Sequence, residues 1–270
     1  MLPIKNKTLK IVLIGSGNVA THLGKMIANS RAFAVIQVYS KTLTHARSLG
    51  NKLNIPWTHH LNDINIHADI YIIAVRDDMI SSVAASLAGL VSKKALVVHT
   101  SGGTSSKVLE AFFKDFGALY PLQTFSKEKK NISHSIPFFI TASGTRSSVI
   151  LRQFAFAMSD QVKVVTDETR AIIHLSAVLV NNFPNYFYFM AERILKSKKI
   201  EFKVVLPLIE ETTAKLKTLQ PMDAQTGPAR RRDIHTIKLH KGLLKKHFPM
   251  WSSIYRDMSN LILSEYKRIN

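Results

Sequence analysis

Apolar residues between positions 10 and 165 form short runs that alternate with segments of helical spacing. The runs are rich in β-branched residues, and between them apolar residues recur three and four positions apart, as on one face of a helix. This alternation predicts βαβ units with right-handed crossovers and a mostly parallel sheet. The expected strands are Lys10–Ile14, Val35–Tyr39, Ile70–Val75, Leu96–His99, Ala118–Tyr120, Pro137–Thr141 and Val162–Val165, and the helical stripes are Val19–Ile27, Ile80–Val91 and Val108–Phe113.

The strand pattern stops near residue 166, and the remainder of the chain has helical spacing. We expect Asp167 to cap the first of these helices and Pro184 to kink or split it. Further helices are expected over about 203–219, 231–247 and 250–268, with a loop over 221–228 that is rich in Pro, Gly and Asp. The sequence therefore predicts two domains, an α/β domain over 1–165 and an all-helical domain over 166–270.

Composition narrows the class of protein. Of the 270 residues, 46% are hydrophobic and 20% are charged, which is typical of a globular chain. No apolar stretch approaches the roughly 20 residues that cross a bilayer, and the run Ile11–Ile14 is too short for a signal peptide. Because the chain has no cysteine, disulfides and thiolate metal sites are excluded. We expect a cytoplasmic protein that contacts no membrane and holds no metal.

The charge balance is strongly basic, with 37 Lys and Arg against 18 Asp and Glu and a net charge of +19. The basic residues are spread along the chain, and no helix-turn-helix, zinc finger or aromatic-interleaved basic segment accompanies them. We interpret them as a basic solvated surface and expect no nucleic-acid partner. Nucleic-acid binding is kept as a weaker alternative, which would lose affinity steeply with added salt.

A glycine-rich turn follows the first expected strand and fits the pattern G-x-G-x-x-A. Turns without β-carbons let a phosphate approach the backbone, and the N–H groups at the start of the next helix bind it. A small third residue lets the helix pack close to the sheet. The sequence therefore predicts a dinucleotide pyrophosphate site, the alternative being a structural turn that binds nothing. Its residues are Gly15, Ser16, Gly17, Asn18, Val19 and Ala20.

The end of the second expected strand indicates which dinucleotide binds. Sites for NAD usually place an acid there for the ribose 2′-hydroxyl, whereas this strand ends in Ser40, Lys41 and Thr42, with Arg47 about a turn later. Hydroxyls and an ammonium suit a 2′-phosphate, which an acid would repel. Because the expected acid is missing, we expect NADP (NADPH) as cofactor, the alternative being that Lys41 is only a surface lysine.

Ligands of open α/β sheets bind at the carboxyl ends of the strands, so the segments 74–78, 99–103 and 120–125 are expected at the far side of the cleft. The first two are candidates for the nicotinamide end. Ala74 and Val75 are small enough to let the backbone approach a flat ring. Thr100, Ser101 and Gly102 follow the fourth expected strand and its His99. The alternatives are that His99 is a satisfied core histidine and that the Ser/Thr/Gly cluster is ordinary loop chemistry.

The helical half contributes two groups of polar residues. His174 and Asn181 are seven residues apart and would share a helix face, with Asn182 close to it, either at a substrate site or in a buried structural network. Arg231 and Asp233 follow a Gly-Pro turn and fall at the start of a helix. An arginine there can bind a carboxylate or phosphate, unless it pairs with Asp233.

The motifs together resemble those of a known family. They are VLIGSGNVATHL, VYSKTLTHA, YIIAVRDDMI, VVHTSGG, YPLQTFS, HLSAVLVNNF and QTGPARRRD, in the expected order over about residues 9–267. They resemble bacterial Rossmann-like proteins with a C-terminal helical domain of unknown function, distant relatives of pyrroline-5-carboxylate reductase and the 6-phosphogluconate dehydrogenase superfamily. The resemblance implies a Rossmann-type sheet, a helical domain like the C-terminal domain of 6-phosphogluconate dehydrogenase, an NADP-linked oxidoreductase activity, and dimerisation through the helical domain.

The resemblance also bears on individual residues. His174 and Asn182 match the family pattern, whereas Asn181 replaces a small residue. Gly227, Pro228, Arg231 and Asp233 match a second pattern in which Arg232 replaces a glycine, and an arginine adopts a positive φ only at a cost.

These observations predict hydride transfer to or from a small, anionic substrate held between the two domains. His174 would donate the proton, Asn182 would orient the substrate, and Arg231 would bind its anionic group. Because no lysine lies one turn before Asn182, a lysine–asparagine hydroxyacid dehydrogenase mechanism is not supported, and reduction of an imine or carbonyl fits better. The alternative function is a non-catalytic NADP-binding sensor or regulatory scaffold.

Overall fold

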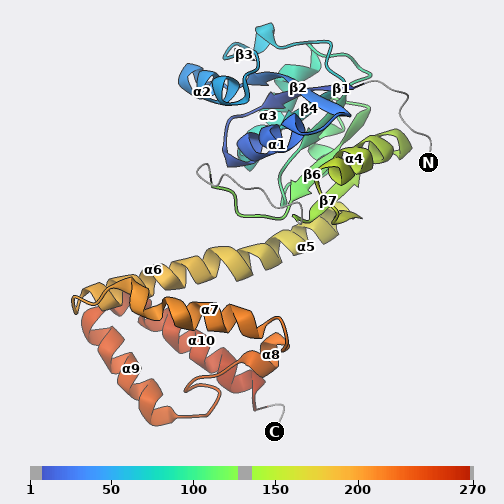
Figure 1. Cartoon of the computed structure of the whole chain (residues 1–270). Helices are drawn as coiled ribbons and strands as arrows, with labels where there is room; N and C mark the ends of the chain where they lie inside the picture. The colour runs from blue at the N-terminus through green and yellow to red at the C-terminus, as the bar shows by residue number, and fades with distance from the viewer. Residues whose placement is uncertain (1–7, 127–135, 268–270) are drawn as a thin grey trace. The chain divides into compact units, whose positions relative to one another are not determined.

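The computed structural model describes residues 8–126 and 136–267 of the chain (Figure 1). The chain divides into two compact units, Met1–Phe187, which contains a sheet, and Tyr188–Asn270, which is helical. The boundary falls inside a helix, further along the chain than the end of the strand pattern.

The first unit is built on an eight-stranded sheet with the strand order β3-β2-β1-β4-β5-β6-β7-β8. Neighbouring strands are parallel except for β6 and β7, which are antiparallel, so the expected mostly parallel sheet is confirmed. The strands are β1 (Leu9–Ile14), β2 (Phe33–Tyr39), β3 (Trp57–Thr58), β4 (Ile70–Ile73), β5 (Leu96–His99), β6 (Asp115–Pro121), β7 (Phe138–Ala142) and β8 (Val162–Val164).

Helices cover both faces of this sheet. On one face, α1 (Asn18–Ala28), α2 (Leu43–Leu53) and α4 (Thr145–Met158) bury residues such as Leu23, Leu49 and Phe154 against the strands. On the other face, α3 (Ile80–Ala88) and a 3₁₀ turn over Ser106–Leu109 bury Ile80 and Leu109. Because the central strands are covered on both sides, their sequences are continuous apolar runs rather than alternating ones.

Two details of the sheet unit differ from the expected elements. Strand β3 was not expected, because two residues are too few to show any periodicity. The stripe Val108–Phe113 was expected to be helical, but only the 3₁₀ turn Ser106–Leu109 forms before β6 begins. Its apolar side chains are still partly or fully buried against the sheet, so the periodicity reflected burial rather than a full helix.

The helix that leaves the sheet unit has three parts. These are α5 (Asp167–Ala177), a π-helical turn (Val178–Asn182) and α6 (Phe183–Lys196). The cap is Thr166, whose side chain accepts a hydrogen bond from the Thr169 N–H, and not Asp167 as expected. The expected break at Pro184 takes the form of the π turn, which ends just before this residue, where a proline cannot donate an N–H to the preceding turn.

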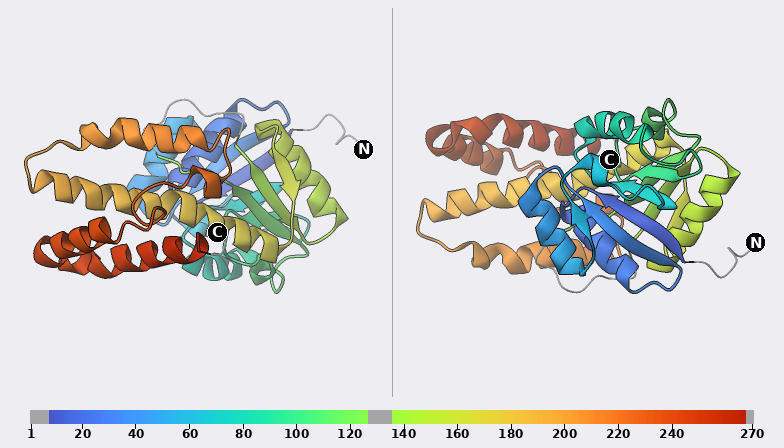
Figure 2. Two further views of the ribbon diagram at one scale, coloured as in Figure 1. Left: turned by 90° about the horizontal axis from the view of Figure 1, so that it is seen from below. Right: turned by 90° about the horizontal axis from the view of Figure 1, so that it is seen from above.

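In the second unit, α6 continues and is followed by α7 (Leu206–Lys215), α8 (Pro221–Ala224), α9 (Ile234–His247) and α10 (Ser252–Glu265). Helices α9 and α10 lie side by side (Figure 2). The small core of the unit contains Met190, Leu244 and Trp251. Helix α8 lies within the expected loop 221–228, where Pro221 provides a favourable first helical residue. No helix in the described ranges is long and apolar enough to span a bilayer.

Candidate dinucleotide and catalytic site

The first glycine of the turn is required by its surroundings. Gly15 has a φ of +110°, and a β-carbon on it would lie 2.2 Å from the Ala74 carbonyl oxygen. Its N–H donates to the Tyr39 carbonyl at 2.8 Å. The turn is therefore held against the carboxyl ends of both β2 and β4, where ligands of open α/β sheets bind.

The start of α1 has the features of an anion site. Gly17 is the residue preceding the helix, it is exposed, and a β-carbon on it would meet no described atom within 4 Å. No side chain caps the helix, and its first turn contains no acidic residue. The first N–H groups of α1 are therefore open to a ligand and aided by the helix dipole. Ala20 is fully buried under the turn, as close packing of helix and sheet requires.

The carboxyl end of β2 presents hydroxyls and a cation beside this turn. The Oγ atoms of Ser16 and Ser40 are 2.8 Å apart, and the side chains of Lys41 and Thr42 are exposed. The guanidinium of Arg47 lies 5.5 Å from the centre of the Trp57 ring and is therefore already engaged. Ser16 also lines a cavity of about 40 Å³. The other lining residues are Thr21, His45, Ser48, Leu49 and Lys52.

A segment that follows β6 packs against the start of α1. The Asn18 side chain donates to the Phe125 carbonyl at 2.7 Å, and His22 Nε2 lies 2.7 Å from the Ser126 carbonyl. The rings of His22 and Phe125 stack with centroids 4.7 Å apart. The predicted cofactor residue Asn18 therefore has a structural partner, and the sequence analysis missed His22, whose apolar helix offered no signal for it.

The two segments expected at the nicotinamide end differ in their burial and in the hydrogen bonds that hold them. Ala74 is nearly buried, and its N–H donates to the Ile14 carbonyl at 2.7 Å, while Val75 is half-buried beside Gly15. The Ser101 hydroxyl donates to Asp77 Oδ2 at 2.7 Å and accepts from the Thr104 N–H at 2.9 Å. Ser101 therefore shapes the loop through these bonds, while its role toward a cofactor stays a prediction.

His99 is a core residue. Its exposed fraction is 0%, and its Nδ1 accepts a hydrogen bond from the Ser101 N–H at 3.2 Å. Burial, together with the nearby Arg170 charge, lowers the pKa of His99 to about 4, so the ring is neutral at physiological pH. His99 is therefore a core histidine without a role as an acid, but it is not fully satisfied, because its buried Nε2 has no hydrogen-bond partner in the described part of the chain.

A buried arginine fixes the start of α5 to the sheet. Arg170 has an exposed fraction of 0% and donates to Thr141 Oγ1 at 2.5 Å, to Asp167 Oδ1 at 2.7 Å, and to the Thr104 carbonyl. Burial alone would raise the pKa of Asp167, but hydrogen bonds from Ser105, the Ser106 N–H and Arg170 outweigh it and bring the pKa to about 2. This ion pair therefore locks helix, strand β7 and loop together.

The same lock orients His174, which lies one helical turn beyond Arg170 on the same face of α5. His174 lies on Gly102, where an added β-carbon would be 2.7 Å from its Cγ and Nδ1. Its Nδ1 is 3.0 Å from the Tyr120 hydroxyl, and the two rings meet edge to face with centroids 5.6 Å apart. The structure thus brings the predicted proton donor onto the predicted nicotinamide loop.

The asparagines of this helix lie differently from the expectation. Asn181 and Asn182 are both exposed, and the Ser176 hydroxyl donates to the Ile172 carbonyl of its own helix, so no buried polar network forms here in the described part of the chain. A π turn advances less per residue than an α turn. The turn Val178–Asn182 therefore interrupts the α-helical spacing on which the shared face of His174 and Asn181 was predicted, and the roles of both asparagines stay predictions.

Arg231 and Asp233 belong to the second unit. The Asp233 carboxylate caps α9, accepting from the Thr236 N–H at 3.0 Å and from its hydroxyl at 2.6 Å. Hydrogen bonds from Thr236, and further the charge of the exposed Arg231, lower the pKa of Asp233, so the pairing alternative stays open beside the predicted anion-binding role of Arg231. Arg232 adopts a φ of +57°, the left-handed conformation of the glycine it replaces.

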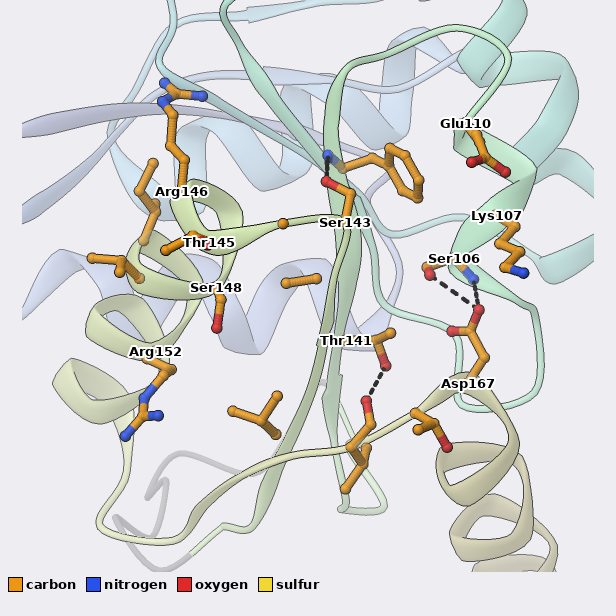
Figure 3. A pocket seen from close by; sticks show the side chains of 18 of the residues that line it. Ser106, Lys107, Glu110, Thr141, Ser143, Thr145, Arg146, Ser148, Arg152 and Asp167 are labelled. Carbon is orange, nitrogen blue, oxygen red and sulfur yellow. Dashed lines mark hydrogen bonds between the residues drawn. The ribbon is translucent and has the colours of Figure 1, made fainter.

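A second, larger cavity of the sheet unit lies elsewhere. Its volume is about 2040 Å³, and Figure 3 shows Ser106 and Asp167 on one side and Thr145, Arg146 and Ser148 on the other. None of the predicted cofactor residues lines it. Arg146 is paired with Asp115 at 2.6 Å, and Asp167 is bonded to Ser106, so the charges of Arg146 and Asp167 are already matched. We therefore do not place the active site in this cavity.

Sequence reasoning placed the segment 120–125 at the carboxyl edge of the sheet but gave Tyr120 no role, and it missed Arg170 altogether. Tyr120 had a signal, because a polar aromatic at the carboxyl end of an expected strand lies where ligands bind. Arg170 also had one, since an arginine three residues after an acid in a largely apolar helix can be buried only with a partner. No cluster of three or more potential metal ligands occurs within residues 8–126 and 136–267.

Two family models match parts of the chain. Residues 10–102 match the family described as NADP oxidoreductase coenzyme F420-dependent, and residues 136–262 match a domain of unknown function, DUF2520. No curated protein matches the chain.

Among solved structures, the "putative NADP oxidoreductase" of Bacteroides fragilis is 37% identical, with a TM-score of 0.89 over 95% of this chain and 98% of that one. A Thermotoga maritima protein is 19% identical, with a TM-score of 0.71 over 96% and 98%. Pyrroline carboxylate reductase of Plasmodium falciparum, with NADP bound, is 15% identical, with a TM-score of 0.59 over 94% and 98%. The last two establish likeness of fold.

The sheet, its glycine turn and the helical C-terminal part define a protein of the NADP oxidoreductase-like fold class. The chain belongs to the family of the Bacteroides fragilis protein and joins a Rossmann domain of the NADP oxidoreductase type to a DUF2520 domain. The family resemblance expected from the sequence motifs is thereby confirmed.

Proposed function

We propose that the chain is an NADP(H)-dependent oxidoreductase that transfers a hydride to or from a small, anionic substrate. The observation that carries the proposal is the glycine turn. Only a glycine fits at position 15 against Ala74, and the uncapped start of α1 follows directly. His174, lying on the loop at Gly102, supports a reaction rather than cofactor storage.

The residues present fit the phosphates of the cofactor. The pyrophosphate would be held by Gly15, Ser16, Gly17 and the first N–H groups of α1, since Gly17 leaves the backbone uncovered. The 2′-phosphate would be held by Ser40, Lys41 and Thr42. The missing acid at the end of β2 removes the repulsion that an NAD-type site would present.

The chemistry divides between cofactor and chain. The nicotinamide supplies the hydride chemistry when it is bound. Thr100 and Gly102 would line its face, while the His174 imidazole carries the proton that accompanies the hydride. Asn182 would orient the substrate, and Arg231 stays the sequence-based prediction for the contact with its anionic group.

The cofactor proposal predicts a strong preference for NADPH that depends on Lys41. In fluorescence titrations with NADPH and NADH, Lys41→Asp should weaken NADPH binding by about tenfold or more, because it reverses a charge beside the 2′-phosphate. NADH affinity should stay the same or rise.

The control is Lys93→Asp, which makes the same charge change in the turn before β5, at the opposite edge of the sheet. It should leave both affinities unchanged. Failure of either cofactor to bind at millimolar concentration would remove the proposal, and equal losses in the two variants would assign the effect to net charge.

The helical unit supports a second part of the proposal, a homodimer formed through its helices. Several of its large apolar side chains are exposed, including Leu208 at 67% and Met250 at 77%. Such side chains are commonly covered by a second subunit.

A further inference from the structure

Strand β6 is longer than its neighbour and carries an aromatic side chain past the sheet edge. Pairing with β5 ends at His99 opposite Ala118, whereas β6 continues to Pro121 alongside β7. Tyr120 therefore stands beyond the end of β5, at the carboxyl edge where the site lies. Its side chain is half-buried, and burial raises the pKa of its hydroxyl, which stays protonated at physiological pH.

His174 approaches Tyr120 from a different element. The buried Arg170 fixes the rotation of α5, and His174 is the next residue along the same face. Gly102 forms the surface under the imidazole, since a β-carbon there would overlap the ring. With Gly102 below and Tyr120 at its edge, the ring is confined on two sides.

The ring nitrogens of His174 are not equivalent. Nδ1 lies 3.0 Å from the Tyr120 hydroxyl. Nε2 has no hydrogen-bond partner in the described part of the chain and is not among its buried unpaired atoms. Nε2 is therefore the nitrogen that can exchange a proton with a substrate.

A phenolic hydroxyl can accept and donate, so it can bond Nδ1 in every state of the ring. When the imidazole is charged, the Nδ1–H donates to Tyr120 Oη. When the neutral ring carries its proton on Nε2, the Tyr120 O–H donates to Nδ1. Phenylalanine at this position could do neither.

We propose that Tyr120 is the positioning residue of the proton donor His174, holding Nδ1 so that Nε2 serves the reaction; this deepens the proposed function and rests on it. In the reductive direction the Nε2–H bond breaks and a bond from hydrogen to the substrate heteroatom forms, while the substrate carbon receives the hydride. The imidazolium becomes neutral and keeps its Nδ1–H on Tyr120. Oxidation reverses each transfer.

The test compares Tyr120→Phe with Tyr255→Phe in the full chain. Tyr255 forms a similar pair with His240 in the second unit, with Oη 2.8 Å from Nδ1 and ring centroids 5.7 Å apart. In ¹⁵N spectra of the histidine rings, assigned with His174→Gln, Tyr120→Phe should shift the His174 Nδ1 resonance to that of an unbonded ring nitrogen. Tyr255→Phe should shift His240 only.

A kinetic measurement separates positioning from structure. With NADPH and a panel of 2-oxo acids and imino acids, His174→Gln should lower kcat by about 100-fold or more, and Tyr120→Phe by about tenfold. NADPH affinity should change by less than about twofold in both variants, and Tyr255→Phe should leave kcat unchanged.

An unmoved Nδ1 resonance in Tyr120→Phe would overturn the proposal. A loss of both NADPH affinity and kcat in Tyr120→Phe would also overturn it, and so would equal losses of kcat in Tyr120→Phe and Tyr255→Phe. Either result is what a purely structural role of Tyr120 predicts. If the wild-type chain does not bind NADPH, the proposed function fails, whereas the resonance still decides whether Tyr120 holds His174, with no turnover required.

Discussion

The two compact units bury their apolar residues to very different extents. In the sheet unit, strands and helices enclose two clusters whose members are almost completely covered. In the helical unit, the buried cluster has Met190, Leu244 and Trp251 at its centre, while many of its other large apolar residues are exposed. The sheet unit therefore has an extensive core of its own, whereas the helical unit has a small one and exposed apolar side chains that the proposed dimer would cover.

The chain offers a direct way to follow the two units separately. It has two tryptophans, Trp57 in β3 of the sheet unit and Trp251 in the core of the helical unit. Replacing either one by phenylalanine leaves a fluorophore that reports on one unit. Each stability prediction below is checked in both backgrounds.

The largest effect is expected in the sheet core. Phe154→Ala removes a fully buried ring that contacts Phe33, with centroids 5.1 Å apart, and should cost about 3–5 kcal/mol of unfolding free energy. The matched change in the helical unit, Leu208→Ala, should cost less than about 0.5 kcal/mol in dilute, monomeric protein, since that side chain is exposed. Urea denaturation measures both, and comparable costs would contradict the contrast.

Acid should destabilise the sheet unit in two steps. The pKa of His99 falls from its ordinary 6.5 to about 4 on folding, so between these values the unfolded chain binds a proton that the folded chain does not. Unfolding free energy therefore falls by about 3 kcal/mol as pH drops from 6.5 to 4. The pKa of Asp167 falls from 3.8 to about 2, which keeps its contribution of about 2 kcal/mol until pH drops below 3.8.

The control for the acid prediction is His99→Gln, which cannot titrate. It should flatten the stability profile between pH 6.5 and 4 when the Trp57 signal is followed, and leave the step below pH 4 in place. An unchanged slope in the upper window would show that other groups cause the loss.

The smallest expected effect in free energy concerns association. Leu239 and Leu243 are exposed four residues apart on one face of α9. Changing both to lysine should weaken the dimer by about tenfold or more, because charges would have to be buried in its interface. Sedimentation velocity checks this, with Lys238→Gln and Lys241→Gln together as the control on the same helix. A wild-type chain that is monomeric at micromolar concentration would contradict the dimer.

The sequence predicted the sheet well because its central strands are covered on both faces and therefore read as apolar runs. The glycine turn was predicted equally well, because the pattern G-x-G-x-x-A between strand and helix reflects a local steric requirement for glycine at position 15. Strand β3, with only Trp57 and Thr58, depends on its neighbour β2 and carries no pattern of its own.

The candidate site was predicted less completely, because its arrangement depends on contacts between distant segments. His174 was identified by residue type, but its neighbours Gly102 and Tyr120 are brought to it only by the packing of α5 on the sheet. Arg232 shows the limit in another way, since it adopts the left-handed conformation that its residue type disfavours. Local preference cannot reveal where tertiary packing outweighs it.

The buried guanidinium of Arg170 also constrains how this sequence can evolve. Its hydrogen bonds reach Thr141, Asp167 and the Thr104 carbonyl on different segments, so removing the side chain of Thr141 or Asp167 leaves the fully buried Arg170 incompletely paired. Single substitutions at these positions are therefore selected against, whereas a combined replacement by apolar residues can be tolerated. Positions 141, 167 and 170 should covary among homologues, because a change at one of them is tolerated only together with changes at the others.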